Sequence, residues 1–290
     1  MERVTGSRLA KLLGSLLIYP FILARRALRR WWRMPDHETV VICYHQVAAE
    51  ERARFARQMD HLLRWTTLVD ASFVPRTGAG RDHQVMVTAD DGWKSFYDHA
   101  VPELNRRDIP FVVFAVSNRL GEAIDGVEGD RLMTAAELRD VAQRATVGSH
   151  TANHLAMTAL SPQDATAELI DSRRQLAALL GRTPALFCFP FSLFDPRVIA
   201  LAREAGYRQV FTDIPQRAGP DEFICGRIRV DPSDWMIEFH LKVMGAYRWT
   251  VSAIALKQAL RAALRSLHPA RHRPRPVADS SGMVQPADPT

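Results

Sequence analysis

The sequence has few cysteines, and this scarcity excludes two classes of protein. It holds three, Cys43, Cys188 and Cys225, which lie far apart and form no C-x-x-C pair. An odd number of isolated cysteines does not build a disulfide framework or a cysteine-ligated zinc module. The pattern favours a reducing compartment.

The sequence also lacks a long apolar run. No uncharged apolar stretch reaches about 18 residues, which excludes a protein with several membrane spans. Hydrophobic residues make up 47% of the 290 residues and charged residues 24%, a balance that excludes a wholly disordered chain. The length suits one domain of about 200–250 residues with extensions.

Positive charge is concentrated at the N-terminus. Residues 1–33 contain eight arginines or lysines and one acid, a net charge of +7. The whole chain carries +6, so residues 34–290 carry −1. A basic end on a nearly neutral body indicates a local interaction and argues against a nucleic-acid partner.

The same N-terminal segment contains thirteen consecutive uncharged residues, 12–24, which Pro20 interrupts. This run is short for a membrane span, which needs about 20 residues. Arginines follow it directly, so no signal-peptide cleavage site is evident. We expect residues 1–35 to form an amphipathic helix on the membrane surface, with Trp31 and Trp32 at the headgroups and the arginines of residues 1–33 on anionic lipid.

Two alternatives remain for this segment, a single short span and a helix packed on the domain. If this segment is a surface anchor, the protein is expected to be associated with the inner membrane. The cytoplasmic face is favoured, and a periplasmic protein with an uncleaved anchor is the alternative.

The rest of the chain alternates short apolar runs with helical patterns. Strands are expected at residues 40–43, 85–88, 111–116, 147–149, 186–189, 208–212 and 224–230, and helices at 51–65, 134–144, 161–181, 195–206, 233–245 and 252–267. Seven strand–helix units in about 230 residues predict a parallel α/β barrel. We place this domain at residues 38–267, followed by a disordered proline-rich tail at 268–290.

Helix ends give further expectations. Thr134 and Glu137 form a capping-box pattern. Ser161 precedes a proline at a first helical position. Ser233 or Asp234 is expected to cap the helix that ends near residue 245.

Ionisable residues follow four of the expected strands. They are His45, Asp90, Asp91, His150, His154, Asp231 and Asp234. Parallel barrels carry their chemistry at the carboxyl ends of the strands, so we expect these side chains to meet.

Asp91, His150 and His154 together offer one carboxylate and two imidazoles. This donor set suits zinc, or another divalent ion, with a position left open for water and substrate. Asp90 beside it is placed to act as a base on that water. Taken separately, an Asp-Asp-Gly sequence is often a turn, and two histidines four residues apart often lie on a solvated helix face.

Five motifs resemble those of the polysaccharide deacetylases, the family with NodB homology also called carbohydrate esterase family 4. They are T-A-D-D-G at 88–92, H-T-A-N-H at 150–154, F-C-F-P-F at 187–191, V-D-P-S-D-W at 230–235 and C-Y-H-Q-V at 43–47. The resemblance covers roughly residues 38–250. It implies a distorted (β/α)7 barrel of TIM-like form and metal-dependent removal of acetyl groups from an N-acetylated sugar.

The resemblance also implies roles for single residues. Asp90 matches the general base, and Asp91, His150 and His154 match the metal ligands. The early histidine, His45, is our candidate for the general acid. The substrate and oxyanion residues are expected to be Phe191 (through its backbone N–H), Trp235, Asp231 and Arg229.

One departure from the family concerns the base. Cys188 stands where many members carry an arginine that braces the catalytic aspartate. Arg227 or Arg229, from the late strand, could take over that role.

These features favour a carbohydrate N-deacetylase of envelope or exopolysaccharide synthesis that depends on one divalent metal ion, with zinc as the expected metal. Its substrate would be a polysaccharide, an oligosaccharide or a lipid-linked sugar. The alternatives are a non-catalytic carbohydrate-binding protein on the same scaffold and a membrane-surface interaction protein.

Overall fold

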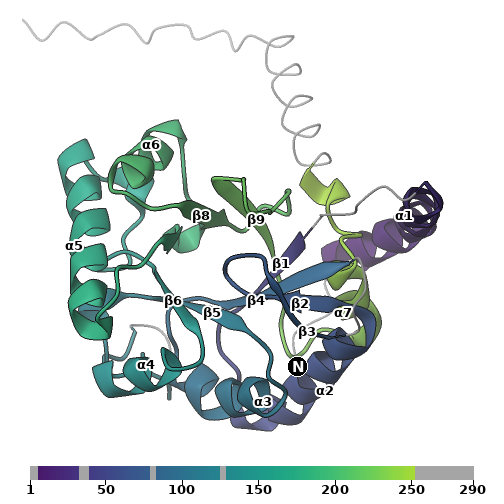
Figure 1. Cartoon of the computed structure of the whole chain (residues 1–290), viewed down its shortest axis with the longest axis horizontal. Coiled ribbons are helices and arrows are strands. Elements are labelled where there is room, and N and C mark those ends of the chain that lie inside the picture. Colours follow the sequence, from purple (N-terminus) through teal and green to yellow (C-terminus); the bar gives the residue numbers. More distant parts are fainter. Residues whose placement is uncertain (1–5, 33–38, 79–82, 125–128, 252–290) are drawn as a thin grey trace, which may run out of the picture. The chain divides into compact units, whose positions relative to one another are not determined.

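Seven parallel strands close into a barrel in the computed structural model, which describes residues 6–32, 39–78, 83–124 and 129–251 (Figure 1). The strands are β1 (Thr39–Tyr44), β4 (Gln84–Ala89), β5 (Phe111–Ala115), β6 (Thr146–Ser149), β7 (Leu186–Cys188), β8 (Gln209–Thr212) and β9 (Ile224–Arg229). They follow one another around the sheet as β1-β9-β8-β7-β6-β5-β4, and β1 closes the barrel by pairing with β4. The expected distorted (β/α)7 barrel is confirmed.

A short hairpin extends the sheet at the start of β4. Its strands β2 (Thr67–Val69) and β3 (Pro75–Gly78) are antiparallel to each other, and β2 pairs with the first residues of β4. The barrel itself is irregular between β6 and β7, where the register holds a single pair, Ser149 with Phe187.

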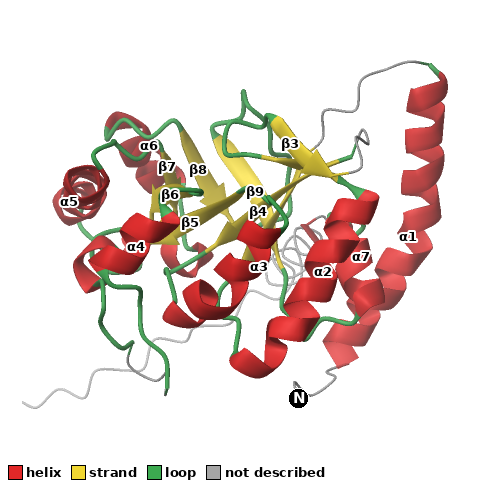
Figure 2. Cartoon of the chain, turned by 60° about the horizontal axis from the view of Figure 1, so that its bottom comes forward, coloured by secondary structure: helices red, strands yellow, loops and turns green. Residues whose placement is uncertain are grey.

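Helices surround the barrel (Figures 1 and 2). They are α2 (Arg52–Trp65), α3 (Val101–Arg106), α4 (Ala135–Val141), α5 (Pro162–Leu180), α6 (Pro196–Glu204) and α7 (Met236–Val243). The predicted capping box is present at α4, where Thr134 Oγ1 accepts from the Glu137 backbone and Glu137 accepts from the Thr134 backbone. Ser161 caps α5 as expected.

The expected cap of α7 is wrong. The helix begins at Met236, its N-cap is Trp235, and no side chain caps it. Asp234 accepts instead from the Asp231 backbone and from Lys242, so its carboxylate is already engaged. The helix expected at 252–267 and the tail at 268–290 lie outside the described residues.

The strands alternate between the barrel interior and the helix layer. On β4, Val85 and Val87 pack toward the helices, whereas Met86 belongs to the interior cluster. On β5, Val112 and Phe114 belong to that same interior cluster. This period of two fixes which residues at the strand ends can reach the barrel axis.

The N-terminal segment is helical, as expected. α1 (Gly6–Trp31) continues through Pro20 and lies beside α7 (Figure 2). By length and composition, α1 is the one helix among the described residues that is long and apolar enough to cross a membrane.

Candidate active site

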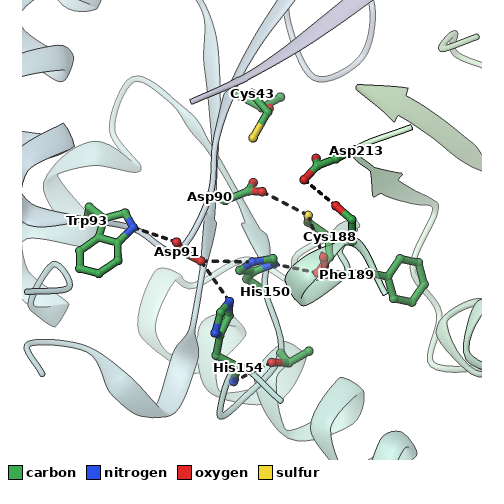
Figure 3. A network of polar contacts seen from close by, with 12 residues as sticks. Cys43, Asp90, Asp91, Trp93, His150, His154, Cys188, Phe189 and Asp213 are labelled. Atoms are coloured by element: carbon green, nitrogen blue, oxygen red, sulfur yellow. Dashed lines mark hydrogen bonds and ion pairs between the residues drawn. The ribbon is translucent and has the colours of Figure 1, made fainter. Parts of the chain in front are cut away.

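Asp91, His150 and His154 come together at the carboxyl ends of β4 and β6 (Figure 3). Asp91 Oδ1 lies 3.3 Å from His150 Nε2 and 3.2 Å from His154 Nε2. One donor atom of each residue lies within 4.8 Å of the others. Asp91 and His150 are buried and His154 is partly exposed, so the cluster has a solvent-facing side.

Neighbouring groups orient each of these side chains. Trp93 Nε1 donates to Asp91 Oδ2 at 2.8 Å, which leaves Oδ1 to face the imidazoles. His150 Nδ1 lies 2.8 Å from the backbone carbonyl oxygen of Cys188, which leaves Nε2 to face Asp91. Such outer contacts set ring orientation in metal sites.

The loop that carries both histidines is held by a buried carboxylate. Glu168 on α5 accepts from the backbone N–H groups of Ala152 and Asn153 at 3.0 and 2.9 Å. Thr151 Oγ1 accepts from the His154 backbone at 2.9 Å. The H-x-x-x-H segment is therefore a fixed loop and not a helix face.

Strained backbone gathers at this site. Seven non-glycine residues in the described part of the chain have a left-handed φ, and five of them belong to the site: Asp91, Thr151, His154, Phe191 and Ser192. Such conformations cost about 1–3 kcal/mol each and persist where surrounding contacts impose them. Their concentration at one end of the barrel marks a functional site.

The charges of the cluster fit a cation. Burial raises the pKa of Asp91, but hydrogen bonds from His150 and His154 lower it more, so the pKa lies well below its ordinary value. Burial lowers the pKa of His150, but Asp91 and Asp90 raise it more, so the net shift is upward. The carboxylates of Asp90 and Asp91 thus favour positive charge at this site. A divalent ion bound to Asp91, His150 and His154 would supply that charge.

Asp90 is held from the opposite side by Arg227 of β9. The guanidinium donates to both carboxylate oxygens at 2.7 Å, and Arg227 is 1% exposed. Arg227 also contacts Asp213 at 2.6 Å and the Sγ of Cys188 at 2.9 Å. Burial raises the pKa of Asp90, but Arg227 lowers it more, and the carboxyl stays ionised far below its usual range.

Strand periodicity explains this pairing. Cys225 belongs to the interior cluster, so Arg227, two residues later on β9, also points to the axis. Arg229 lies at the strand end and is exposed. Of the two arginines that the sequence offered as a brace for Asp90, Arg227 makes the contact.

His45 lies on the same axis, after β1. Ring and carboxylate donor atoms of His45 and Asp90 lie within 4.8 Å of each other. The Nδ1 of His45 is buried, and among the described residues it has no hydrogen-bond partner. A cavity of about 460 Å³ opens beside it, and Arg229 and Asp231 line the same cavity.

The other expected substrate residues lie on the rim. Phe191 is 61% exposed, and its ring stacks near that of His154 with centroids 4.6 Å apart. Trp235 is 42% exposed, and the Arg8 guanidinium of α1 lies 5.2 Å from its ring centroid. Phe191 thus adjoins the cluster, whereas Trp235 contacts α1.

Sequence reasoning missed four residues of the site. They are Trp93, Glu168, Ser192 and Asp213. Asp213 follows β8 directly, so a search of every strand end for carboxylates would have found it; Ser192 donates to it at 2.6 Å. Trp93 and Glu168 act through contacts that no spacing rule reveals.

Comparison with known proteins agrees with the motifs. Residues 77–210 match the family model described as polysaccharide deacetylase. This match agrees with the family resemblance that the motifs carry.

Individual relatives are distant. The putative polysaccharide deacetylase YxkH of Bacillus subtilis (strain 168) is 24% identical over 151 residues, which cover 51% of this chain and 52% of YxkH. The chain therefore spans about half the length of that curated relative.

Solved structures share the fold. IcaB from Ammonifex degensii superposes with a TM-score of 0.60 at 24% identity, covering 73% of this chain and 97% of that one. The deacetylase PplD of Streptococcus pyogenes, in complex with acetate, superposes with a TM-score of 0.59 at 20% identity, covering 71% and 98%.

Proposed function

We propose that this protein is a divalent-metal-dependent hydrolase that removes N-acetyl groups from an N-acetylated sugar. The observation that carries the proposal is the cluster of Asp91, His150 and His154 beside the ionised, buried Asp90. One carboxylate and two imidazoles suit zinc. A divalent ion held there would polarise the substrate carbonyl and lower the pKa of a water.

The chain's own residues supply the proton transfers. Asp90, kept ionised by Arg227, accepts the proton of the attacking water. His45, within 4.8 Å of Asp90 and with a free buried Nδ1, gives a proton to the departing amine. The products are acetate and the free amino sugar.

The substrate residues surround this centre. The backbone N–H of Phe191, which has a left-handed φ, would hold the developing oxyanion. Arg229 and Asp231 lie on the cavity beside His45, where they would bind sugar hydroxyls. The ring of Trp235 would close the outer wall of the sugar site.

The domain division and location complete the proposal. Residues 38–267 form the catalytic domain, residues 1–35 attach it to the inner membrane on the cytoplasmic face, and 268–290 form a tail. The function would belong to envelope or exopolysaccharide synthesis.

Acetate release tests the activity. The full chain, stripped with chelator and then loaded with one equivalent of zinc, should release acetate from N-acetylglucosamine oligosaccharides, measured by NMR. His45→Ala should reduce turnover about 100-fold, the usual scale for general acid catalysis. Binding of the oligosaccharide without acetate release, with zinc or other divalent ions, would support the non-catalytic carbohydrate-binding protein instead.

A further inference from the structure

α1 packs on the barrel through a narrow face that makes four polar contacts and buries Leu12 in the core. The contacting pairs are Arg8–Glu238, Ser15–Trp249, Tyr19–His240 and Arg26–His83, at 2.9, 3.0, 2.7 and 2.7 Å. These α1 positions recur at intervals of seven, four and seven residues, so they share one face of the helix. A helix of a soluble domain ordinarily buries most of its large apolar side chains, whereas most of those on α1 are exposed.

The opposite face of α1 is apolar and exposed. It contains Leu9, Leu13, Leu16, Leu17, Pro20, Phe21, Leu23, Ala24, Leu28 and Trp31. Leu17, Phe21 and Trp31 are 74%, 75% and 84% exposed. A continuous apolar strip of this length marks an interaction surface.

The borders of this strip identify its occupant. At 100° per residue, Lys11 and Arg25 lie along one border and Arg30 along the other, and all three are exposed. An apolar face edged by cations fits an anionic lipid surface. A second copy of the chain would bring these cations against one another, so the bilayer is favoured over self-association.

α1 runs from the catalytic end of the barrel to the opposite end. Arg8, in its first turn, contacts Glu238 and the Trp235 ring, which follow the carboxyl end of β9. Arg26, in its last turns, contacts His83, which precedes β4. If α1 lies flat in the interface, the barrel rests on its side, and the mouth of the site opens along the membrane surface.

The apolar surface continues from α1 to this mouth. Trp235, Met236 and Ile237 are all exposed at the start of α7. The contact between Arg8 and Trp235 joins them to the first turn of α1, where Leu9 begins the outward strip. Exposed apolar side chains therefore lie both on α1 and beside its first turn, near the rim of the site.

We propose that α1 and residues 235–237 form one membrane-binding surface, and that the substrate is a sugar whose lipid stays in the bilayer while its N-acetyl group enters the site from the side. This inference rests on the proposed deacetylase function. It narrows the substrate class from any N-acetylated sugar to a membrane-borne amphiphile.

Paired substrates test the proposal. The full chain is assayed on a soluble N-acetylglucosamine oligosaccharide and on the same sugar attached to a lipid in phosphatidylglycerol–phosphatidylcholine vesicles. Leu17→Glu/Phe21→Glu should abolish vesicle binding and reduce turnover of the lipid-borne sugar at least about tenfold, because local concentration is lost. Its turnover of the soluble sugar should stay at the wild-type level.

Ile170→Glu is the matched control, since Ile170 is an exposed apolar residue of α5, which lies across the barrel from α1 in both views (Figures 1 and 2). It should keep vesicle binding and both activities. A lipid-borne rate that survives in the α1 variant, or vesicle binding that is lost in Ile170→Glu as well, overturns the surface. Wild-type protein that binds vesicles but deacetylates neither sugar overturns the deacetylase function and leaves the surface standing.

Orientation has a separate readout. An environment-sensitive fluorophore is placed on Ile237→Cys and, as the matched control, on Gln163→Cys of α5; the three native cysteines are buried. Anionic vesicles should shift the emission of the fluorophore at position 237 to shorter wavelength and leave the emission of the fluorophore at position 163 unchanged. An unshifted label at 237 in vesicle-bound protein overturns the sideways orientation.

Discussion

Arg227 is the residue on which the proposed base depends. Its side chain is fully buried and donates to both oxygens of Asp90, and it is also paired with Asp213. It approaches from β9, while Cys188 on β7 occupies the place where many family members carry an arginine. In this chain the cation beside Asp90 therefore comes from β9.

Replacing this cation should reduce both activity and stability. Arg227→Met leaves the buried carboxylate of Asp90 without its cation, which costs about 3–5 kcal/mol of unfolding free energy. Turnover should fall about 10–100-fold, as for other groups that orient catalytic residues. Denaturant unfolding and acetate release measure the two effects.

A second substitution separates positioning from general damage. Cys188 Sγ lies 3.6 Å from Asp90 Oδ2, so Arg227→Met/Cys188→Arg returns a guanidinium to the carboxylate from β7. The double variant should recover part of the lost turnover. If Arg227→Met is as active as wild type, or if the double variant is no better than the single one, Arg227 does not position the base.

The residues of the site were partly predictable. Asp90, Asp91, His150, His154 and His45 were found because parallel strands bring their carboxyl ends together and because the motifs are specific. Arg227 and Arg229 lie two residues apart on β9 and share its inward parity, so parity could not separate them. The choice needed their depth along the strand: Arg227 is buried within β9, whereas Arg229 is exposed at its end. Glu168 could not be found because its role arises from a contact between α5 and a distant loop. Trp93 lies only two residues from Asp91, but the sequence does not show that its indole N–H turns back to that carboxylate.

At the scale of elements, α1, α2 and α7 meet around a pair of histidines. His61 Nε2 on α2 lies 2.9 Å from His240 Nδ1 on α7, and Tyr19 of α1 contacts the other nitrogen of His240. Burial lowers the pKa of His61 to about 4, with smaller contributions from His240 and Arg64. Burial and Arg26 lower the pKa of His240 in the same direction.

This junction should weaken in acid. An unfolded histidine titrates near 6.5, so between pH 6.5 and 4 the unfolded chain binds more protons than the folded one, and stability falls as pH falls. The contribution of His61 is about 1 kcal/mol after allowance for its partial exposure. His61→Gln should therefore show a smaller drop in thermal midpoint than wild type between pH 7.5 and 5. If the thermal midpoint falls equally in the two proteins, His61 does not contribute to the loss of stability in acid.

Elements were predicted best where local chemistry decides them. The capping box at Thr134 and the proline after Ser161 placed α4 and α5 correctly. The β2–β3 hairpin was missed because its strands are short and β3 reads P-R-T-G, without apolar alternation. The predicted cap of α7 was wrong because the carboxylate of Asp234 accepts from Lys242 instead, a contact that depends on tertiary packing.

At the scale of the molecule, the candidate site lies at one end of the barrel, and α1 begins beside that end. The interior period of two carries His45, Asp90 and Arg227 to the axis, while the loop held by Glu168 brings the histidines beside them. α1 extends from that end along the wall, with its apolar face outward. We propose that α1 therefore holds the active site at the same membrane surface that carries the substrate.

The most direct test of this account compares zinc content with acetate release in two variants. Asp90→Asn should retain about one zinc per chain, as in wild type, and lose nearly all turnover, because it removes the base but none of the ligands. His154→Ala should lose both zinc and turnover, because it removes a ligand. Full zinc content in His154→Ala, or wild-type acetate release by Asp90→Asn, would contradict the account.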